Sequence, residues 1–385
     1  MNAQGTWTQK ADFGGISRGD AVGFSIGTKG YIGIGSSNLS PYNFKDFWEW
    51  DQGTNVWTQK ADFPGTARGQ GVGFSIGTKG YIGTGINYQA MLEFSDFWEW
   101  DQATNTWTAK SNFGGGPRSG AIGFSIGNKG YIGTGENHST NALFHDLWEW
   151  NPINDSWTQK VELPASTRYF AVGFSIGTKG YIGTGYDSTF TPINDFWEWD
   201  QSTNTWTQKA DFPIVNIGAV GFSIANSGFI GTGKRLKDFW QWDSFNNNWI
   251  QKANFGGTGR GWTVGFSIGN KGYIGTGDDS IGVQKDFWEY TPDSSSGINE
   301  IEQINVTIDA YPNPNNGIFN VSYHLSSSNS TLDILDITGK TIYYISIIGK
   351  EGEQKITIPN ITDGIYFYRI NSNNETLTGK FIVHM

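Results

Sequence analysis

Short apolar runs separated by Gly, Asn and Asp recur along the chain up to about residue 290. Typical runs are VGFSI at 22–26, KGYIG at 29–33 and FWEWD at 47–51. Runs of this length, rich in aromatic and β-branched residues, predict short strands. The G-T-K-G and D-Q-x-T-N segments between them supply the positive φ angles of tight hairpin turns. The pattern therefore predicts consecutive antiparallel strands and an all-β fold.

The strands belong to a unit that occurs six times. Each copy opens with a tryptophan, at spacings of 50, 50, 50, 49 and 43 residues: Trp7, Trp57, Trp107, Trp157, Trp206 and Trp249. Four strands per unit at this period are typical of a propeller blade and not of a solenoid coil. The glycine-rich strand of each unit suits the crowded region near the axis. We therefore expect a six-bladed β-propeller.

The two ends of the repeat region complement each other. The chain opens with a WTQKADF strand that lacks the three strands before it, and the last copy ends at DFWEY without a tryptophan strand after it. We expect residues 7–13 to add the outermost strand to a sixth blade whose inner strands come from residues 260–290. This arrangement removes the open edge of an incomplete blade.

The unit R-x-x-A-V-G-F-S-I-G-x-K-G-Y-I-G-T-G, followed by D-F-W-E-W-D and T-N-x-W, resembles the kelch repeat. The glycine doublet of that family appears here as G-T-G, and as G-I-G at Gly33–Gly35 in the first copy. The resemblance covers residues 5 to about 291. It implies a kelch-type propeller for residues 1–291.

A polar segment at 292–299, which contains Ser294, Ser295, Ser296 and Gly297, predicts a linker. Beyond it, alternating stretches such as 318–324, 332–337, 341–347 and 365–370 predict further short strands. A small immunoglobulin-like β-sandwich is the expected fold of residues 300–385.

Several ordered motifs of this segment resemble the C-terminal sorting domain of type IX secretion. They are Y-P-N-P-N-N-G at 311–317, D-I-T-G-K at 336–340, D-G-I-Y at 363–366 and G-K-F-I-V at 379–383. The resemblance implies that residues 300–385 are a partner of the type IX machinery. It also implies export across the outer membrane of a Gram-negative bacterium, to the surface or the medium. An adhesive module is the alternative interpretation of the same segment.

Composition excludes several classes of function. The net charge of -10 and the pI near 4.9 provide no basic stripe, so nucleic acid is not an expected partner. The absence of cysteine excludes disulfides, thiolate metal sites and a Cys nucleophile. Residues 1–5 show no basic and apolar signal-peptide pattern before the first repeat. We expect no cofactor and a monomeric protein.

Five arginines are the candidate residues of a ligand-binding face. Each arginine lies eleven residues after a repeat tryptophan, beside the loops that differ most between copies. Variable loops on a constant scaffold are the usual place for binding. The other interpretation, which we favour, pairs each arginine with a blade aspartate. In the fifth copy we assign the arginine position to Ile217 and expect Lys234, Arg235 and Lys237 to supply the positive charge. The arginines are Arg18, Arg68, Arg118, Arg168 and Arg260, and the aspartates are Asp46, Asp96, Asp146, Asp195, Asp238 and Asp286.

Two other sets of residues suggest chemistry, but a structural role is favoured for each. Glutamates of the tryptophan-rich strands are expected to pair across strands with lysines, and their repetition argues against catalysis. His138, His145 and Glu136 share one loop, for which we favour a solvated loop over a metal site. We expect neither catalytic nor metal-binding residues. The glutamates are Glu49, Glu99, Glu149, Glu198 and Glu289, and the lysines are Lys10, Lys60, Lys110, Lys160, Lys209 and Lys252.

The sequence favours a secreted or cell-surface protein that recognises a protein or a glycan through the variable-loop face. A carbohydrate-active enzyme that acts on an acidic sugar, similar to sialic-acid epimerases, is an alternative. A structural component of the cell surface is a second alternative. Whether the protein is an enzyme stays open, with a non-enzymatic role favoured.

Overall fold

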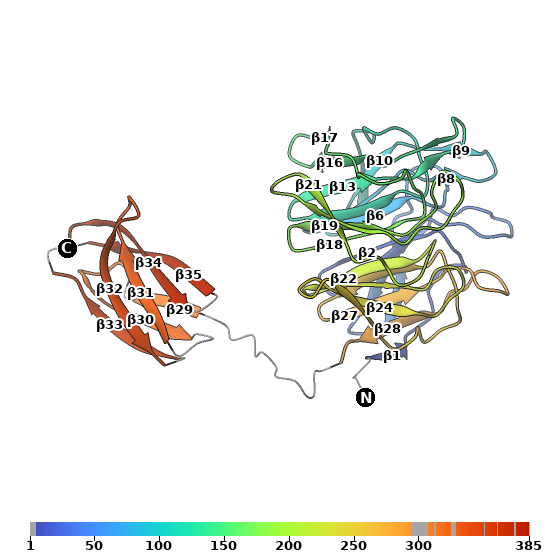
Figure 1. The fold of residues 1–385 in the computed structure, drawn as a ribbon. Helices are drawn as coiled ribbons and strands as arrows, with labels where there is room; N and C mark the ends of the chain where they lie inside the picture. Colours follow the sequence, from blue (N-terminus) through green and yellow to red (C-terminus); the bar gives the residue numbers. More distant parts are fainter. Residues whose placement is uncertain are drawn as a thin grey trace. The chain divides into compact units, whose positions relative to one another are not determined.

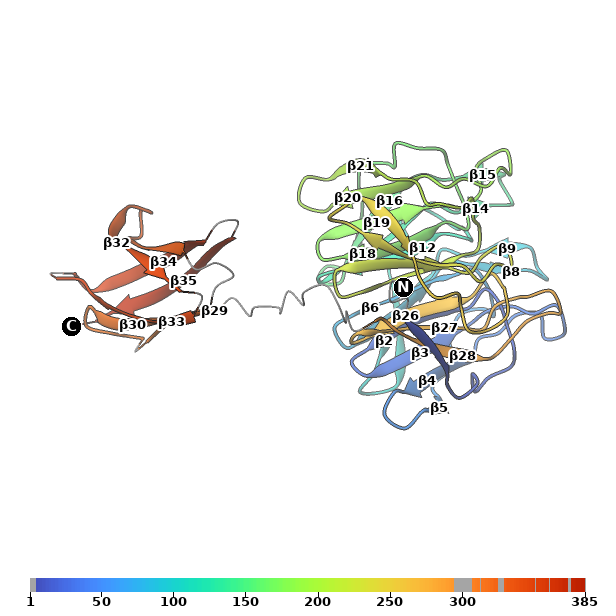
Figure 2. The same cartoon turned by 60° about the horizontal axis from the view of Figure 1, so that its bottom comes forward.

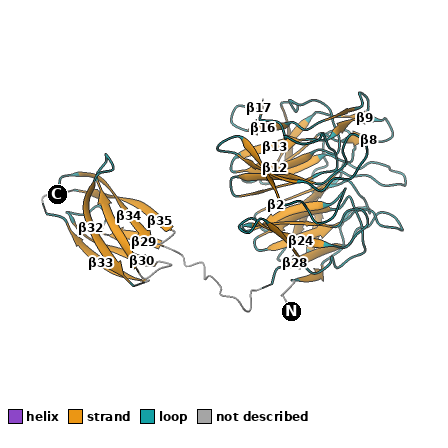
Figure 3. Cartoon of the chain, in the orientation of Figure 1, coloured by secondary structure: helices purple, strands orange, loops and turns teal. Residues whose placement is uncertain are grey.

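The computed structural model describes residues 5–293, 307–311, 313–324, 329–349, 351–359, 361–372 and 375–384. The chain divides into two compact units, Met1–Ser294 and Ser295–Met385. Every regular element of these described residues is a β-strand (Figure 3). None of them belongs to a helix long and apolar enough to cross a membrane. The prediction of an all-β fold is confirmed.

The first unit consists of six four-stranded antiparallel sheets, the blades of a propeller (Figure 1). Blades 1 to 6 are named in chain order of their innermost strands. Two-stranded hairpins extend the loops of blades 2 and 3: β8 (Ile86–Asn87) with β9 (Leu92–Glu93), and β14 (Glu136–Asn137) with β15 (Ala142–Leu143). From the innermost strand outward, blade 1 is β2 (Val22–Ile26), β3 (Lys29–Gly33), β4 (Phe47–Asp51), β5 (Val56–Gln59); blade 2 is β6 (Val72–Ile76), β7 (Lys79–Gly83), β10 (Phe97–Asp101), β11 (Thr106–Lys110); blade 3 is β12 (Ile122–Ile126), β13 (Lys129–Gly133), β16 (Leu147–Asn151), β17 (Ser156–Gln159); blade 4 is β18 (Val172–Ile176), β19 (Lys179–Gly183), β20 (Phe196–Asp200), β21 (Thr205–Lys209); blade 5 is β22 (Val220–Ile224), β23 (Ser227–Gly231), β24 (Phe239–Asp243), β25 (Asn248–Gln251); blade 6 is β26 (Val264–Ile268), β27 (Lys271–Gly275), β28 (Phe287–Thr291), β1 (Thr6–Gln9).

The ring closes between the first and last blades. The innermost strands contact one another in sequence, and β26 of blade 6 contacts β2 of blade 1. The outermost strand of blade 6 is β1, which pairs with β28 so that Trp7 lies opposite Tyr290 (Figure 1). Lys10 adds an ion pair of 3.2 Å to Glu289 of the same blade. Segments from the two ends of the unit therefore complete one sheet.

Glycines at two positions of each blade permit the close packing of neighbouring blades. A Cβ on Gly23 would lie 2.0 Å from Val264 of the adjacent blade, and one on Gly30 would lie 2.4 Å from the Phe266 ring. The glycine pattern of the inner strands is therefore required by the contact between blades.

Aromatic side chains fill the space between blades farther from the axis. Trp50 is fully buried and packs against Tyr273 and Phe287 of blade 6, with ring centroids 5.0 and 5.1 Å apart. Its indole Nε1 donates to Asn55 Oδ1 at 3.1 Å. Buried indoles require such a partner. Trp100, Trp150 and Trp199 repeat this hydrogen bond at 3.2 Å. Trp242 of blade 5 is also fully buried but lacks this bond within the described structure, and Tyr290 takes the place of the tryptophan in blade 6.

The second unit is a β-sandwich of two antiparallel sheets (Figure 2). Phe319, Leu332, Ile334, Ile370 and Phe381 are buried between the sheets and form its core. The strands alternate between this core and solvent, as expected for a sandwich. One sheet is β29 (Thr307–Tyr311), β30 (Ile318–His324) and β33 (Glu351–Thr357), and the other is β32 (Thr341–Ile348), β31 (Asn329–Leu335), β34 (Gly364–Ser372) and β35 (Glu375–Val383).

Candidate functional site

The five candidate arginines lie under the variable loops and not on their surface. Arg18 is fully buried, and its two terminal nitrogens bind Asp46 at 2.6 and 2.8 Å. The same guanidinium donates to the carbonyl oxygens of Ile16 and Ile34, both at 2.9 Å. It lies over the Phe44 ring at 4.1 Å, a cation–π geometry. Burial alone would raise the pKa of Asp46, but the hydrogen bonds and charge of Arg18 hold that pKa below its usual value.

The same pairing recurs in blades 2, 3, 4 and 6, where Arg68, Arg118, Arg168 and Arg260 bind Asp96, Asp146, Asp195 and Asp286. All five arginines are at most 1% exposed. The interpretation as charge pairs is confirmed for these blades. The assignment of the five arginines to a ligand-binding face stays a prediction, which is disfavoured by their burial and by their ion pairs with aspartates.

Blade 5 departs from the prediction. The residue in the arginine position is Asn216, not Ile217, because Asn216 Nδ2 donates to Thr232 O at 2.7 Å as Arg18 does to Ile34 O. The stretch between Trp206 and the inner strand is one residue shorter in this copy, so counting from the tryptophan gives the wrong position. Counting back from the A-V-G-F-S-I run identifies Asn216.

Asp238 of blade 5 consequently has no cationic partner among the described residues. Arg235 instead binds Asp278 at 3.1 Å, and neither Lys234 nor Lys237 forms an ion pair in the described part of the chain. Burial raises the pKa of Asp238, and its Oδ1 is buried without a hydrogen-bond partner. The expected replacement of the missing arginine by Lys234, Arg235 and Lys237 is therefore wrong.

The glutamates of the tryptophan-rich strands are used structurally in five blades. Their distances to the lysine of the next strand are between 3.0 and 3.4 Å. In blade 5, Gln241 donates to Ser227 Oγ at 2.8 Å instead. The predicted cross-strand pairing is confirmed. The pairs are Glu49–Lys60, Glu99–Lys110, Glu149–Lys160, Glu198–Lys209 and Glu289–Lys10.

The two loop histidines have separate partners. His138 lies 2.9 Å from Glu93 and 3.5 Å from Glu136, whereas His145 lies 3.2 Å from the Ala165 carbonyl oxygen and 3.4 Å from Glu162. Among the described residues, no group of three His, Asp or Glu side chains is arranged to hold a metal ion.

A ring of six residues closes the propeller axis at the end that carries the variable loops. Each residue, two positions after the arginine or its equivalent, has a positive φ between 53° and 60°. Their backbones form a circle in which each N–H donates to the carbonyl oxygen of the preceding blade, at 2.8 to 3.3 Å. We call this set the axial ring: Asp20, Gln70, Gly120, Phe170, Gly218 and Trp262.

The axial ring combines a regular backbone with irregular side chains. Positive φ is costly for bulky residues, so Phe170 and Trp262 are backbone outliers of the kind that cluster at functional sites. Sequence analysis did not identify the ring. The available signal was a position that differs in side-chain type, Asp, Gln, Gly, Phe, Gly and Trp, inside an otherwise near-constant repeat.

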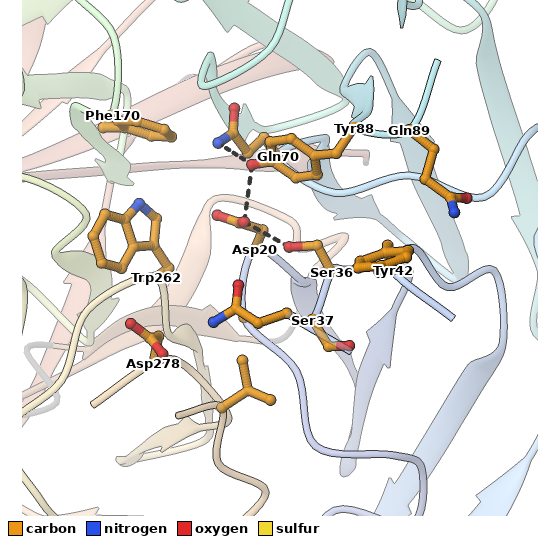
Figure 4. A pocket seen from close by; sticks show the side chains of 13 residues that line it. Asp20, Ser36, Ser37, Tyr42, Gln70, Tyr88, Gln89, Phe170, Trp262 and Asp278 are labelled. Atoms are coloured by element: carbon orange, nitrogen blue, oxygen red, sulfur yellow. Dashed lines mark hydrogen bonds between the residues drawn. The ribbon is translucent and has the colours of Figure 1, made fainter. Parts of the chain in front are cut away.

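A pocket of about 580 Å³ opens above the axial ring (Figure 4). The axial residues Asp20, Gln70, Phe170 and Trp262 form its floor and one side. Its volume falls in the range of small-molecule sites. Among the described residues that line it there is no Lys, Arg or His. The other lining residues come mainly from loops of blades 1, 2 and 6: Gly19, Ser36, Ser37, Asn38, Tyr42, Tyr88, Gln89, Asp278 and Val283.

Asp20 is the central polar group of this pocket. Its Oδ2 accepts hydrogen bonds from Ser36 Oγ at 2.7 Å and Tyr88 OH at 3.0 Å, and Gln70 Nε2 donates to the same Tyr88 oxygen (Figure 4). Burial raises the pKa of Asp20 and the negative charge of Asp278 adds to the effect, against the lowering influence of Ser36 and Tyr88. The charged carboxylate therefore reduces the stability of the folded protein.

Comparisons with known proteins support the two-part architecture. Residues 309–384 match the family described as secretion system C-terminal sorting domain. This match supports export of the protein to the cell surface or into the medium. The solved "Structure of YjhT" is similar with a TM-score of 0.65 and 18% sequence identity, over 75% of this chain and 99% of that one. At this identity the likeness shows the fold alone. No curated protein matches the chain.

Replacing Arg118 by Ala is expected to lower the free energy of unfolding by about 3–5 kcal/mol, because it leaves the Asp146 carboxylate beneath the loop without its partner. Arg235→Ala is the matched control, since it removes an ion pair whose arginine side chain is 55% exposed and should cost less than about 1 kcal/mol. Chemical denaturation measures both. Similar losses for the two variants would contradict the buried-pair interpretation.

Asp20→Asn is expected to stabilise the protein at neutral and higher pH. Because the pKa of Asp20 is raised in the folded state, its contribution to stability is present at low pH and is lost as the pH rises and the carboxyl ionises. The variant should raise the melting temperature by roughly 2–4 °C at pH 8. The difference should shrink as the pH falls below the pKa of Asp20. A pH-independent difference in melting scans would show that Asp20 charge is not the cause.

Proposed function

We propose that this protein is an extracellular recognition protein, in which a kelch-type propeller binds a glycan or a protein ligand in the pocket above the axial ring. The observation that carries the proposal is the break in symmetry at that ring. Six near-identical blades present the same backbone there, but the six positions carry five different residue types, and four of these residues line a cavity. Constant strands that carry variable loops and a variable axial position are typical of a binding site on a rigid scaffold.

The C-terminal sandwich serves transport in this proposal. Its match to a sorting domain supports recognition by the type IX machinery and passage across the outer membrane of a Gram-negative bacterium. Ligand recognition is then the task of the propeller, whose axial pocket is built entirely from residues of the first unit.

An enzyme acting on an acidic sugar is disfavoured by the pocket. Such an enzyme needs cationic groups for the substrate carboxylate, and the arginines that suggested this alternative are buried in pairs with aspartates. Asp20 and Asp278 instead place negative charge in the pocket. Like charges oppose binding most strongly where water is partly excluded.

A combined glycan-array and pull-down screen with the full-length chain tests the recognition proposal. Any specific ligand is expected to be lost in Trp262→Ala, since that change removes the largest side chain of the pocket wall. Phe245→Ala is the matched control, because Phe245 is 94% exposed and does not line the pocket. The screen measures retention at equal protein concentration. A specific ligand retained equally by both variants would place recognition elsewhere, and the absence of any ligand would favour a structural surface component.

Export is tested separately in a host that is competent for type IX secretion. With a signal peptide supplied, removal of residues 300–385 is expected to leave a folded propeller in the periplasm, because the segment matched to the sorting domain is gone. Fusion of residues 292–385 to an exported reporter should send the reporter to the surface or the medium. Cell fractionation measures both. Efficient export of the truncated protein would contradict the sorting role and favour an adhesive module.

A further inference from the structure

The pocket above the axial ring has one aromatic side. Phe170 and Trp262 lie at 83° to each other with ring centroids 6.2 Å apart, so they form a corner. Each ring is placed against the α-carbon of a ring glycine. A Cβ on Gly218 would lie 3.2 Å from the Trp262 indole, and one on Gly120 would lie 3.4 Å from the Phe170 ring. The small residues of the axial ring therefore leave room for the two large ones.

The opposite side is polar and offers both donors and acceptors. Ser36, Tyr88 and Gln70 form a hydrogen-bonded chain around Asp20, and both bonds from Ser36 and Tyr88 end on Oδ2. Figure 4 shows the second carboxylate oxygen turned toward the side of Trp262. Oε1 of Gln70 is buried without a hydrogen-bond partner in the described structure. Such a group is costly while it is unpaired, and because Gln70 also lines the pocket, a rotation of its side chain would let a ligand hydroxyl donate to this oxygen.

The charge of the pocket opposes anionic ligands but does not require a cationic ligand. Asp20 and Asp278 line the pocket, and this negative charge opposes a carboxylate or sulfate. A cationic ligand is not required, because Arg235 binds Asp278 at 3.1 Å and Asp20 accepts hydrogen bonds from the neutral groups of Ser36 and Tyr88. The remaining lining groups, which include the amides of Asn38 and Gln89, exchange hydrogen bonds in both directions.

The floor of the pocket limits how far a ligand enters. The space inside the axial ring is about 110 Å³, room for only a few water molecules. Below it the channel is lined by Ala, Val, Ile, Gly and Thr at the start of the innermost strands. A ligand therefore rests on the ring between the aromatic corner and the polar side.

We infer that this pocket binds an uncharged sugar residue, with its C–H face on Trp262 and its hydroxyls hydrogen-bonded to Asp20 and Gln70. Aromatic faces attract weakly polarised C–H groups, and the other edge of a sugar supplies hydroxyls that donate and accept. A ring that presents both properties matches the aromatic side and the polar side together. This inference rests on the proposed function and specifies its ligand.

Saturation-transfer NMR with the full-length protein tests the inference. The probes are methyl glycosides in matched series: glucose, glucosamine and glucuronic acid, and the galactose equivalents. We expect transfer to ring protons of at least one neutral probe, and at least tenfold weaker binding of the matching uronate. Trp262→Ala should weaken binding at least tenfold, whereas Trp262→Phe, which keeps an aromatic face, should retain much of it. Asp20→Asn should also weaken binding, and melting scans exclude misfolding of each variant.

Four outcomes overturn the inference. Binding of the uronate as strong as that of the neutral probe would show that the pocket accepts anions. At least tenfold tighter binding of the amino sugar would show a cation site. Absence of any sugar signal, together with a protein partner captured by the wild type and lost in Trp262→Ala, would refute the sugar and leave the recognition proposal standing. If neither kind of ligand depends on Trp262, the recognition proposal fails as well.

Discussion

The close contact between neighbouring innermost strands is the constraint on which the rest of the propeller depends. Gly23 and Gly30 let Val264 and Phe266 of the preceding blade approach within the space that a Cβ would occupy, and the other blades repeat this contact. Because six such contacts must close into a circle, each blade packs closely against both of its neighbours. The aromatic packing farther out and the pairing of β1 with β28 complete the same closed arrangement.

The closed circle of blades fixes the backbone of the axial ring. Its backbone hydrogen bonds run from blade to blade, and they hold six residues at positive φ whatever side chain each one carries. The position can therefore vary without disturbing the fold. Two aromatic residues, an aspartate and a glutamine of the ring, together with the surrounding loops, produce a pocket with an aromatic side and a polar side. The strain at Phe170 and Trp262 is tolerated because the surrounding blades determine their conformation.

The charged groups divide into two kinds according to their partners. Arg18 and its counterparts in four other blades are buried but use their donors on aspartates and carbonyl oxygens, so they stiffen the loops under the pocket. Among the residues that the structure describes, Asp238 and Asp20 have no such cationic partner, and burial raises the pKa of both. Within this part of the chain, Asp238 is left without a cation because blade 5 has Asn216 in the position of the arginine. Asp20 lies in the pocket, where a carboxylate that reduces stability is consistent with selection for binding.

The sequence by itself determined the all-β class, the six blades, and the repeated Arg–Asp and Glu–Lys ion pairs. Each of these depends on local alternation or on a spacing that repeats every 43 to 50 residues, and both are visible in one dimension. It could not show that Arg18 is fully buried, because burial depends on the loop that covers it. It also could not show that Asn216 replaces the arginine of blade 5, because this copy is one residue shorter and counting from the repeat tryptophan gives the wrong position. The pocket was decided only by tertiary structure. Asp20, Gln70, Phe170 and Trp262 lie in four different blades, and only closure of the ring brings their side chains to one axis.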